Sequence, residues 1–328
     1  MDLTPETPEY KLPALEFQNK HLTSVKFTPR AKLNPKLLGN DLAQDNFPAM
    51  TARRRSSAMQ THAFVLVPLY IYPEAGKWDP LYTAISEYPT LLFSIVINPQ
   101  NGPGGSPGSF PDANYMNGIS TLRSYPNVQL LGYVHTSGTA RPMRQIESDL
   151  LTYATWSSHP RVRLALDGVF IDECPSDDLS STIEYMRAVC TFARHTIAGA
   201  HLTFNPGVPV PEVYYSLADT IVTFEDHHNK LSTDVAKFPF DHIPDSVRCR
   251  CAFLIHDYKG DDRKQADLVT TIVGRMGIPG LFITTHSYER WSELWEDFVD
   301  DLSDVKVGIK YEEEPKGWKK LMGRLLRD

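Results

Sequence analysis

Long apolar segments are absent from this sequence. No apolar run in its 328 residues approaches the roughly 20 residues that a helix needs to cross a bilayer, so we expect no membrane-spanning segment. The N-terminal residues MDLTPETPEY carry acids and prolines in place of the basic and apolar regions of a signal peptide. From these residues alone, the expected location is cytoplasmic.

Basic residues are fewer than acidic residues in this chain. Lysine and arginine number 33 against 40 aspartates and glutamates, which leaves a formal net charge of -7. Proteins that bind nucleic acids normally carry a basic patch or stripe. We therefore expect no nucleic-acid partner.

Cysteine is rare, with 4 in the chain. Cys249 and Cys251 are too close together for an ordinary disulfide, and no C-x-x-C metal-binding spacing occurs. Cys174 directly follows two acids, but no general base lies near it in the sequence, so we do not assign it as a nucleophile. Together with Cys190, these residues are interpreted as structural thiols.

Several cofactor motifs are also absent. No G-x-G-x-x-G follows an apolar run, and the glycine-rich segment at residues 98–114 lacks the Lys-Ser/Thr of a phosphate-binding loop. We interpret that segment as a flexible surface loop over the site. The motif EDHHN supplies His227 and His228, which with His256 and nearby acids form an alternative divalent-metal site. Since H-E-x-x-H and H-x-H are both missing, we predict neither a metal nor a cofactor.

What the sequence does contain is an alternation of short apolar runs with longer amphipathic segments. Near-continuous runs rich in Val, Ile, Leu and Phe are typical of parallel strands buried on both faces. Eight such runs occur, at residues 62–70, 90–99, 128–136, 166–173, 200–207, 219–226, 250–258 and 277–285.

Helices are predicted between most of these runs. Asp112 is a candidate N-cap for a helix over residues 113–125, and Pro142 precedes a helix over residues 143–156. Asp178 is a candidate N-cap for the next helix. Further helices are predicted at residues 178–197, 261–276 and 289–302, with a short one near 211–218 and an irregular connection over 227–246.

Eight strand–helix pairs in this order predict a single (β/α)8 barrel, an α/β fold, over residues 61–303. The alternative is an open doubly wound sheet, which the missing dinucleotide motif disfavours. Residues 1–60 are predicted to be an irregular, partly disordered N-terminal arm. Residues 304–328 are predicted to be a C-terminal tail with a short basic amphipathic helix.

Functional groups gather where the predicted strands end. In such barrels the active site lies at the carboxyl ends of the strands. The motif DGVFIDECPSDD ends a buried run in two acids, which are costly to bury unless they are paired or used. The other strand ends carry Tyr70, Tyr72, Asn98, Tyr133, His135, Asn205, Glu225 and His256, and the two acids are Asp172 and Glu173.

This set of side chains suits carbohydrate chemistry. Glycosidic cleavage needs two carboxyl groups that flank the scissile bond. Tyr70, Tyr72 and Tyr133 are predicted to stack on sugar rings. Asn98, Asn205, His135 and His256 are predicted to bind sugar hydroxyls. A structural reading stays open for each acid, such as a helix N-terminal carboxylate for Asp172 or an arginine partner for Glu173.

Seven segments carry a resemblance to the spherulin-4 family of (β/α)8 glycoside hydrolases: VPLYIYPEAGKWDPLY, SIVINPQNGPG, LGYVHTSG, DGVFIDECPSDD, TFNPGVPVPEVYY, TIVTFEDHHN and GIPGLFITT. The resemblance implies hydrolysis of an α-linked polysaccharide rich in galactosamine or N-acetylgalactosamine, as in fungal galactosaminogalactan. It implies that the functional acids are Asp172, Glu173 and Glu225, and that the protein is secreted or anchored at the cell surface.

The leading hypothesis is therefore an endo-acting glycoside hydrolase, expected to be a monomer with a polysaccharide or oligosaccharide substrate. We expect Asp172 to be a direct catalytic carboxylate with Glu225 as its partner. Glu173 is expected to be a second acid or to orient the substrate, because adjacent strand residues face opposite sides. The alternatives are a non-catalytic carbohydrate-binding or structural barrel, and a metal-assisted hydrolase of another bond.

Overall fold

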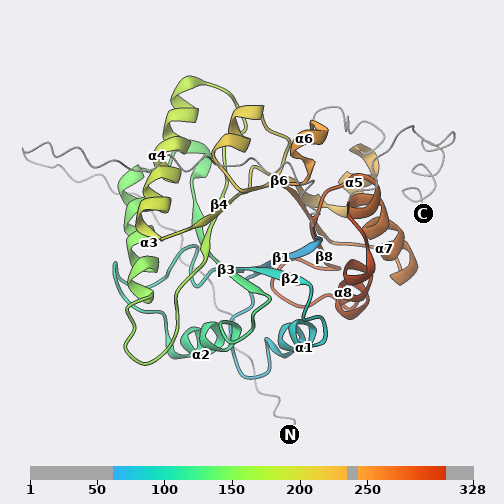
Figure 1. The fold of residues 1–328 in the computed structure, drawn as a ribbon, viewed down its shortest axis with the longest axis horizontal. Coiled ribbons are helices and arrows are strands. Elements are labelled where there is room, and N and C mark those ends of the chain that lie inside the picture. Colours follow the sequence, from blue (N-terminus) through green and yellow to red (C-terminus); the bar gives the residue numbers. More distant parts are fainter. Residues whose placement is uncertain (1–61, 235–242, 308–328) are drawn as a thin grey trace, which may run out of the picture. The chain divides into compact units, whose positions relative to one another are not determined.

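Eight parallel strands close into a barrel in the computed structural model, which describes residues 62–234 and 243–307. The strands pair in chain order, and β1 closes the ring against β8 (Figure 1). This confirms the predicted (β/α)8 barrel. The strands are β1 (Phe64–Leu69), β2 (Leu92–Ile97), β3 (Val128–His135), β4 (Gly168–Asp172), β5 (His201–Phe204), β6 (Thr220–His227), β7 (Cys251–His256) and β8 (Gly280–Ile283).

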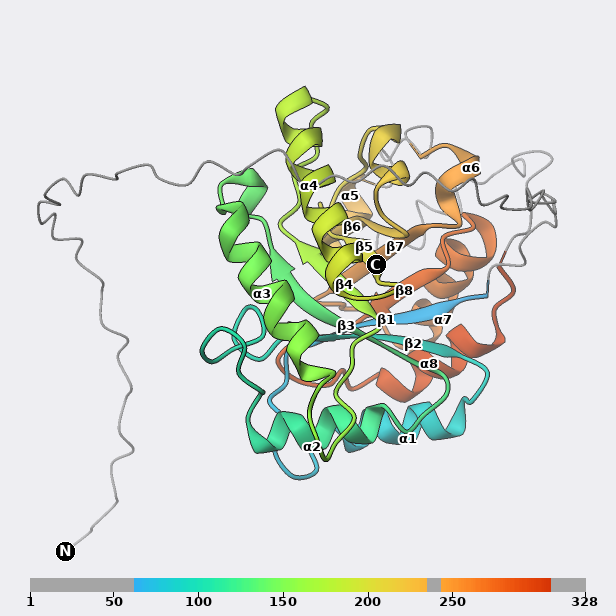
Figure 2. The same cartoon turned by 60° about the vertical axis from the view of Figure 1, so that its left-hand side comes forward.

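Helices surround the ring of strands. In two views α3 and α4 lie side by side against neighbouring strands (Figure 1 and Figure 2). The helices of the described residues are α1 (Asp79–Glu87), α2 (Ala113–Leu122), α3 (Met143–Trp156), α4 (Ser180–Thr196), α5 (His228–Asp234), α6 (Asp245–Arg248), α7 (Asp262–Val269) and α8 (Trp295–Asp304). Short 3₁₀ segments at Ser137–Thr139 and Glu212–Ser216 and a π-helical turn at Thr270–Arg275 complete the described connections.

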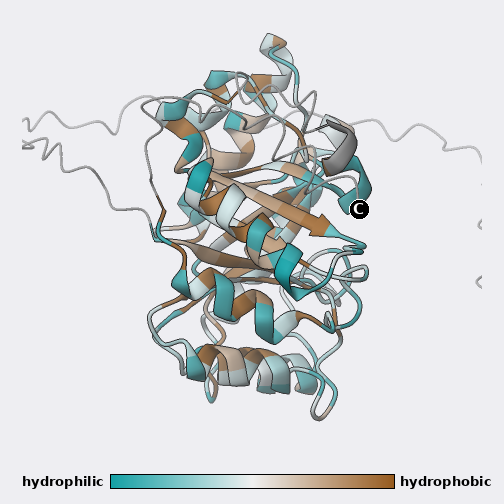
Figure 3. Ribbon diagram, turned by 90° about the vertical axis from the view of Figure 1, so that its right-hand side faces the viewer, coloured by the Kyte–Doolittle hydropathy of each residue, from teal (hydrophilic) through white to brown (hydrophobic). Residues whose placement is uncertain are grey.

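The apolar runs form the core, as their composition predicts. Figure 3 shows hydrophobic colour concentrated on the strands and hydrophilic colour on the outer helix surfaces. Strands β1 and β7 each bury five of their six residues. Burial on both faces explains why these runs do not alternate with polar residues. No helix in the described parts of the chain is long and apolar enough to cross a membrane.

Several predicted helix boundaries are confirmed. Helix α3 spans the predicted residues, and the predicted cap Asp112 accepts a hydrogen bond from the Tyr115 backbone N–H at 3.0 Å. Asp261 caps α7 in the same way, through the Lys264 N–H at 2.9 Å. These side chains satisfy backbone donors that have no partner within the helix.

Other boundaries were predicted wrongly. Asp178 is not the N-cap of α4, because the helix begins after Leu179, whose N–H donates to Asp177 instead. The last helix begins at Trp295, because the hydroxyl of Ser292 bonds to neighbouring loop atoms and keeps the preceding residues out of the helix. The connection after β6 opens directly into helix α5, where an irregular segment was expected.

Helix α1 had no specific prediction, although Pro80 in its first turn is a typical start signal. The predicted arm at residues 1–60 and the amphipathic helix of the predicted tail lie outside the described residues.

Gly168 sets the spacing between β4 and β5. A Cβ atom at this position would lie 2.0 Å from the backbone oxygen of His201. Backbone atoms cannot swing aside as a side chain can, so only glycine fits here. The close approach fixes the strand that leads to Asp172.

Replacing Gly168 with alanine is expected to destabilise the barrel by about 3 kcal/mol, the upper end of the cost of overpacking, because the clash is with backbone. The measurement is the free energy of unfolding in urea. Gly138→Ala is the matched control, since its Cβ would meet nothing within 4 Å and only its positive φ opposes the change. The control should cost about 1 kcal/mol. Equal losses in both variants would contradict this account of Gly168.

Candidate active site

Three neighbouring strands bring two acids to one amide at the carboxyl-terminal rim. Asp172 ends β4, Asn205 directly follows β5, and Glu225 lies near the end of β6. The Nδ2 group of Asn205 donates to Asp172 Oδ1 at 2.7 Å and also to Glu225 Oε2. Asn205 Oδ1 accepts from the Gly207 N–H at 3.1 Å, which fixes the orientation of the amide. One buried amide therefore holds both carboxylates.

A tyrosine supplies a second hydrogen bond to each acid. The Tyr133 hydroxyl donates to Asp172 Oδ2 at 2.7 Å, and the Tyr288 hydroxyl donates to Glu225 Oε1 at 2.7 Å. Tyr70 stands between the two tyrosines, with ring centroids 5.9 Å from Tyr133 and 5.6 Å from Tyr288. Burial, reinforced by the neighbouring acids, raises the pKa of all three hydroxyls, so the tyrosines stay protonated donors.

The environment raises the pKa of both carboxyl groups. For Asp172 the main cause is burial, which the hydrogen bonds from Tyr133, the Glu173 backbone and Asn205 oppose. For Glu225 burial again dominates; the hydrogen bonds from Asn205 and Tyr288 oppose the rise in pKa, and the nearby charge of Asp172 adds to it. Both acids lie at the same rim, and both pKa values are raised above those of ordinary carboxyl groups. One of the two can therefore hold a proton near neutral pH, as acid–base catalysis requires.

Glu173 occupies a different place from its neighbour Asp172. Its backbone has φ 51°, and its side chain is 56% exposed and turns toward the loop after β3. There Glu173 Oε2 accepts from the Ser137 hydroxyl at 2.9 Å and lies 3.6 Å from His135 Nδ1. The arginine partner left open for Glu173 from the sequence is not found among the described residues; the nearby Arg141 pairs with Asp149 at 2.6 Å.

The remaining predicted residues divide into two groups. His135 and His256 lie at the rim, with ring centroids 6.4 Å from Tyr133 and 5.9 Å from Tyr288. Tyr72 and Asn98 are hydrogen-bonded within the neighbouring loops, and their substrate contacts stay predictions. The Tyr72 hydroxyl donates to Asp112 at 3.2 Å, and Asn98 Oδ1 accepts from the Gly102 N–H at 3.2 Å.

Sequence reasoning missed Tyr288 and Ser137. Tyr288 follows the last apolar run by only a few residues. The polar residues at the end of that run, Thr284, Thr285 and His286, were the one sequence signal that pointed to this part of the rim. Its contact with Glu225 depends on a loop that folds back over the rim, which no local pattern encodes.

Cys174 has the environment of a structural thiol. Its side chain is buried and donates to the Ile171 carbonyl at 3.0 Å. Burial raises its pKa well above the ordinary thiol value, whereas a nucleophilic cysteine needs a lowered pKa. The cysteines are all free, and Cys249 is the exposed one.

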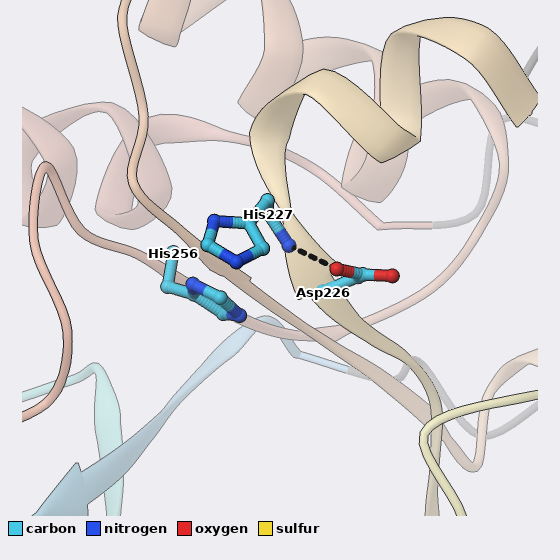
Figure 4. A group of neighbouring side chains, drawn as sticks. All are labelled: Asp226, His227 and His256. Atoms are coloured by element: carbon cyan, nitrogen blue, oxygen red, sulfur yellow. Dashed lines mark hydrogen bonds between the residues drawn. The ribbon is translucent and has the colours of Figure 1, made fainter.

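One group of side chains among the described residues has the composition of a metal site. Asp226, His227 and His256 each offer a ligand atom, and these atoms all lie within 4.8 Å of one another (Figure 4). The group borders the site, because Asp226 directly follows Glu225 on β6.

Fold and side chains together define a (β/α)8 barrel whose carboxyl-terminal rim holds two acids hydrogen-bonded to the side-chain amide of Asn205. Three tyrosines, Tyr70, Tyr133 and Tyr288, pack beside these acids. A family model described as spherulation-specific family 4 matches residues 64–302. The chain therefore belongs to this family, in agreement with the resemblance read from its motifs.

Two relatives illustrate the similarity. Sph3 from Aspergillus clavatus, in a crystal structure of its complex with GalNAc, is 34% identical with a TM-score of 0.68, and the match covers 74% of this chain and 98% of that one. Spherulin-4 from Physarum polycephalum is 32% identical over 174 residues, which are 53% of this chain. The match spans 48% of that relative, so the chain corresponds to about half of its length.

The raised pKa of Glu225 has a consequence for stability. A carboxyl whose pKa is higher in the folded than in the unfolded protein contributes stability below the unfolded value, and this stability is lost as the pH rises through the folded value. Glu225→Gln removes the ionisation. We expect the variant to melt at a higher temperature than the wild type at pH 8, with the difference shrinking toward pH 4.

Thermal unfolding followed by circular dichroism at several pH values measures this difference. Glu173→Gln is the control, because a largely exposed carboxyl should leave the melting temperature nearly unchanged. A lower melting temperature for Glu225→Gln at pH 8 would show that ionised Glu225 stabilises the fold, against our account.

Proposed function

We propose that the protein is a glycoside hydrolase that cleaves an α-linked polymer of galactosamine or N-acetylgalactosamine. The observation that carries the proposal is the pair Asp172 and Glu225 on the shared amide of Asn205. Membership of the spherulation-specific family and the GalNAc bound to the Sph3 relative support an amino-sugar substrate.

Asp172 receives three hydrogen bonds that favour its ionised form, whereas Glu225 receives two, so we assign the two acids different roles. Ionised Asp172 is stabilised by Tyr133, Asn205 and the Glu173 backbone, so Asp172 acts as the carboxylate nucleophile. The charge of Asp172 helps Glu225 to keep its proton, so Glu225 acts as the general acid. Glu225 protonates the glycosidic oxygen as the bond to the anomeric carbon breaks, and Asp172 forms a bond to that carbon. Glu225 then deprotonates the water that releases Asp172.

The spacing of the acids supports retention of configuration. An oxygen of each carboxylate contacts the same amide nitrogen, so these two oxygens lie within two hydrogen-bond lengths, about 6 Å at most. Retaining glycosidases place their carboxyl groups about 5–5.5 Å apart, whereas inverting enzymes use about 6.5–9.5 Å. The arrangement fits the retaining distance better.

The surroundings suit a sugar chain. Tyr70 packs edge to face against Tyr133 and Tyr288 beside the acids. Tyr133 is buried, whereas Tyr70 and Tyr288 are partly exposed, so a sugar ring can stack on these two. A cavity of about 310 Å³ lies between the glycine-rich segment and His135. Neighbouring sugar units of a polymer can extend into this space, where His135 is a lining residue that contacts Ser137 and Glu173.

The central test is product release from acetylated and deacetylated α-1,4-galactosamine polymer, followed by mass spectrometry. Asp172→Asn and Glu225→Gln are each expected to lower the rate by about 10³-fold or more, within the range known for positioned acids and bases. Asp178→Asn, an exposed acid later in the same loop, is the control and should keep full activity. NMR of the first product should show the retained anomer.

Full activity in both Asp172→Asn and Glu225→Gln would overturn the assignment. Polymer binding by a folded wild-type protein that releases no product would favour the alternative of a non-catalytic carbohydrate-binding barrel.

Tyr133→Phe tests the hydrogen bond that lowers the pKa of Asp172. Without this donor the pKa of Asp172 should rise. The acidic limb of the pH–rate profile should then move to higher pH, and kcat should fall about tenfold. Tyr72→Phe is the matched control, because the Tyr72 hydroxyl bonds to Asp112 and should leave the profile unchanged. An identical acidic limb in Tyr133→Phe and wild type would contradict the role given to Tyr133.

A further inference from the structure

Two histidines on adjacent strands share one carboxylate beside the active site. His227 ends β6 and His256 ends β7, and their ring centroids lie 4.3 Å apart. Nδ1 of His227 lies 3.0 Å from Asp257 Oδ2, and Nδ1 of His256 lies 2.7 Å from the same oxygen. Asp257 thus contacts the same nitrogen of both rings.

This contact leaves the second nitrogen of each ring available. A neutral imidazole that donates Nδ1–H to a carboxylate carries its lone pair on Nε2. Histidines that bind metals in proteins almost always donate their other ring N–H to a carboxylate, a carbonyl or water. Asp257 provides that carboxylate for both histidines at once.

The backbone of Asp257 is held in an uncommon conformation. Its φ is 51°, and its N–H donates to the His286 carbonyl at 3.1 Å, which ties it to the chain after β8. Strained positions of this kind cost energy and persist where the surrounding structure fixes them. In this conformation one oxygen of the Asp257 carboxylate reaches Nδ1 of both rings.

Asp226 completes a set of three ligand atoms. Figure 4 shows the Asp226 carboxylate on one side of the two rings, and one of its oxygens accepts from the backbone N–H of His227 at 2.7 Å. The ligand atoms of the three residues lie within 4.8 Å of one another. Bonds of about 2.0–2.2 Å in a tetrahedral site place the ligand atoms about 3.3–3.6 Å apart. The three side chains would close on the ion by up to about 1.5 Å, and the half-exposed ring of His227 has room to move.

The charges and ligand types suit a divalent transition-metal ion of intermediate softness. Two imidazoles and a carboxylate are common ligands of Zn²⁺, and three protein ligands leave a coordination position open. Asp226 and Asp257 supply two negative charges, while Lys259 is the cation that acts on Asp257. Neither histidine is hydrogen-bonded to Asp172 or Glu225, although His256 is close enough for its charge to act on Glu225.

We propose that Asp226, His227 and His256 bind one divalent transition-metal ion such as Zn²⁺ at the rim, with Asp257 orienting both imidazoles. This goes beyond the proposed hydrolase activity and departs from the expectation of no metal drawn from the motifs. Asp226 directly follows Glu225 on β6, so the proposed site adjoins the two acids, and its fourth position would be left to water or a sugar hydroxyl.

The experiment is a titration with Co²⁺, which replaces Zn²⁺ and reports its coordination through visible absorption. The full-length chain, freed of any oligohistidine tag and of bound metal, is titrated and then challenged with Zn²⁺. We expect saturation at one ion per chain and displacement by Zn²⁺. His227→Ala, His256→Ala and Asp226→Asn should each weaken binding at least about tenfold, and Asp257→Asn about 10- to 100-fold.

His228→Ala is the matched control. His228 adjoins His227 in the chain, but its ring packs on Tyr258 with centroids 4.6 Å apart, so the variant should bind as the wild type does. Circular dichroism confirms that each variant is folded, and Asp226→Asn keeps the shape of the side chain. No saturable binding by the wild type, or unchanged binding in both His227→Ala and His256→Ala, would overturn the proposal. Binding is measured without substrate, so its failure is distinct from failure of the proposed hydrolase activity.

Discussion

The Nδ2 group of Asn205 donates one hydrogen bond to Asp172 and another to Glu225, and the arrangement of the rim depends on this shared amide. Two buried carboxylates repel each other and lose hydration. The amide offsets part of both costs by giving each acid a donor, and the hydroxyls of Tyr133 and Tyr288 give each a second. These hydrogen bonds do not fully offset the effect of burial, so the pKa of both acids is raised. A raised pKa suits a carboxyl group that transfers a proton near neutral pH.

The barrel makes this contact possible through strand register. The Asn205 N–H donates to the Ile171 carbonyl at 2.8 Å, and the Glu225 N–H donates to the Gly207 carbonyl at 3.1 Å. These backbone bonds bring the ends of β4, β5 and β6 to one level. Gly168 lets β4 and β5 approach closely at their other ends. Asp172, Asn205 and Glu225 are therefore held on strands or directly at their ends, which suits a precise geometry, while Tyr288 reaches Glu225 from the loop after β8.

Much of this could be predicted from the sequence, because buried parallel strands and the polar residues at their ends are local patterns. Asp172, Asn205 and Glu225 each end an apolar run, and a barrel brings such ends together. The patterns did not show that Tyr288 reaches Glu225 or that Glu173 turns outward, since both depend on loops that fold back over the rim. The contacts of Asp257 with two histidines could not be predicted either, because they depend on the pairing of neighbouring strands and on a positive φ at Asp257.

The shared environment of the two acids is tested most directly by NMR titration of their carboxyl carbons in the wild type and in Asp172→Asn. The account predicts that Glu225 titrates above the ordinary glutamate value of about 4.3 in the wild type. Its pKa should fall in Asp172→Asn, where the neighbouring charge is gone. A Glu225 that titrates at its ordinary value, unchanged by the substitution, would contradict the coupling on which the proposed chemistry rests.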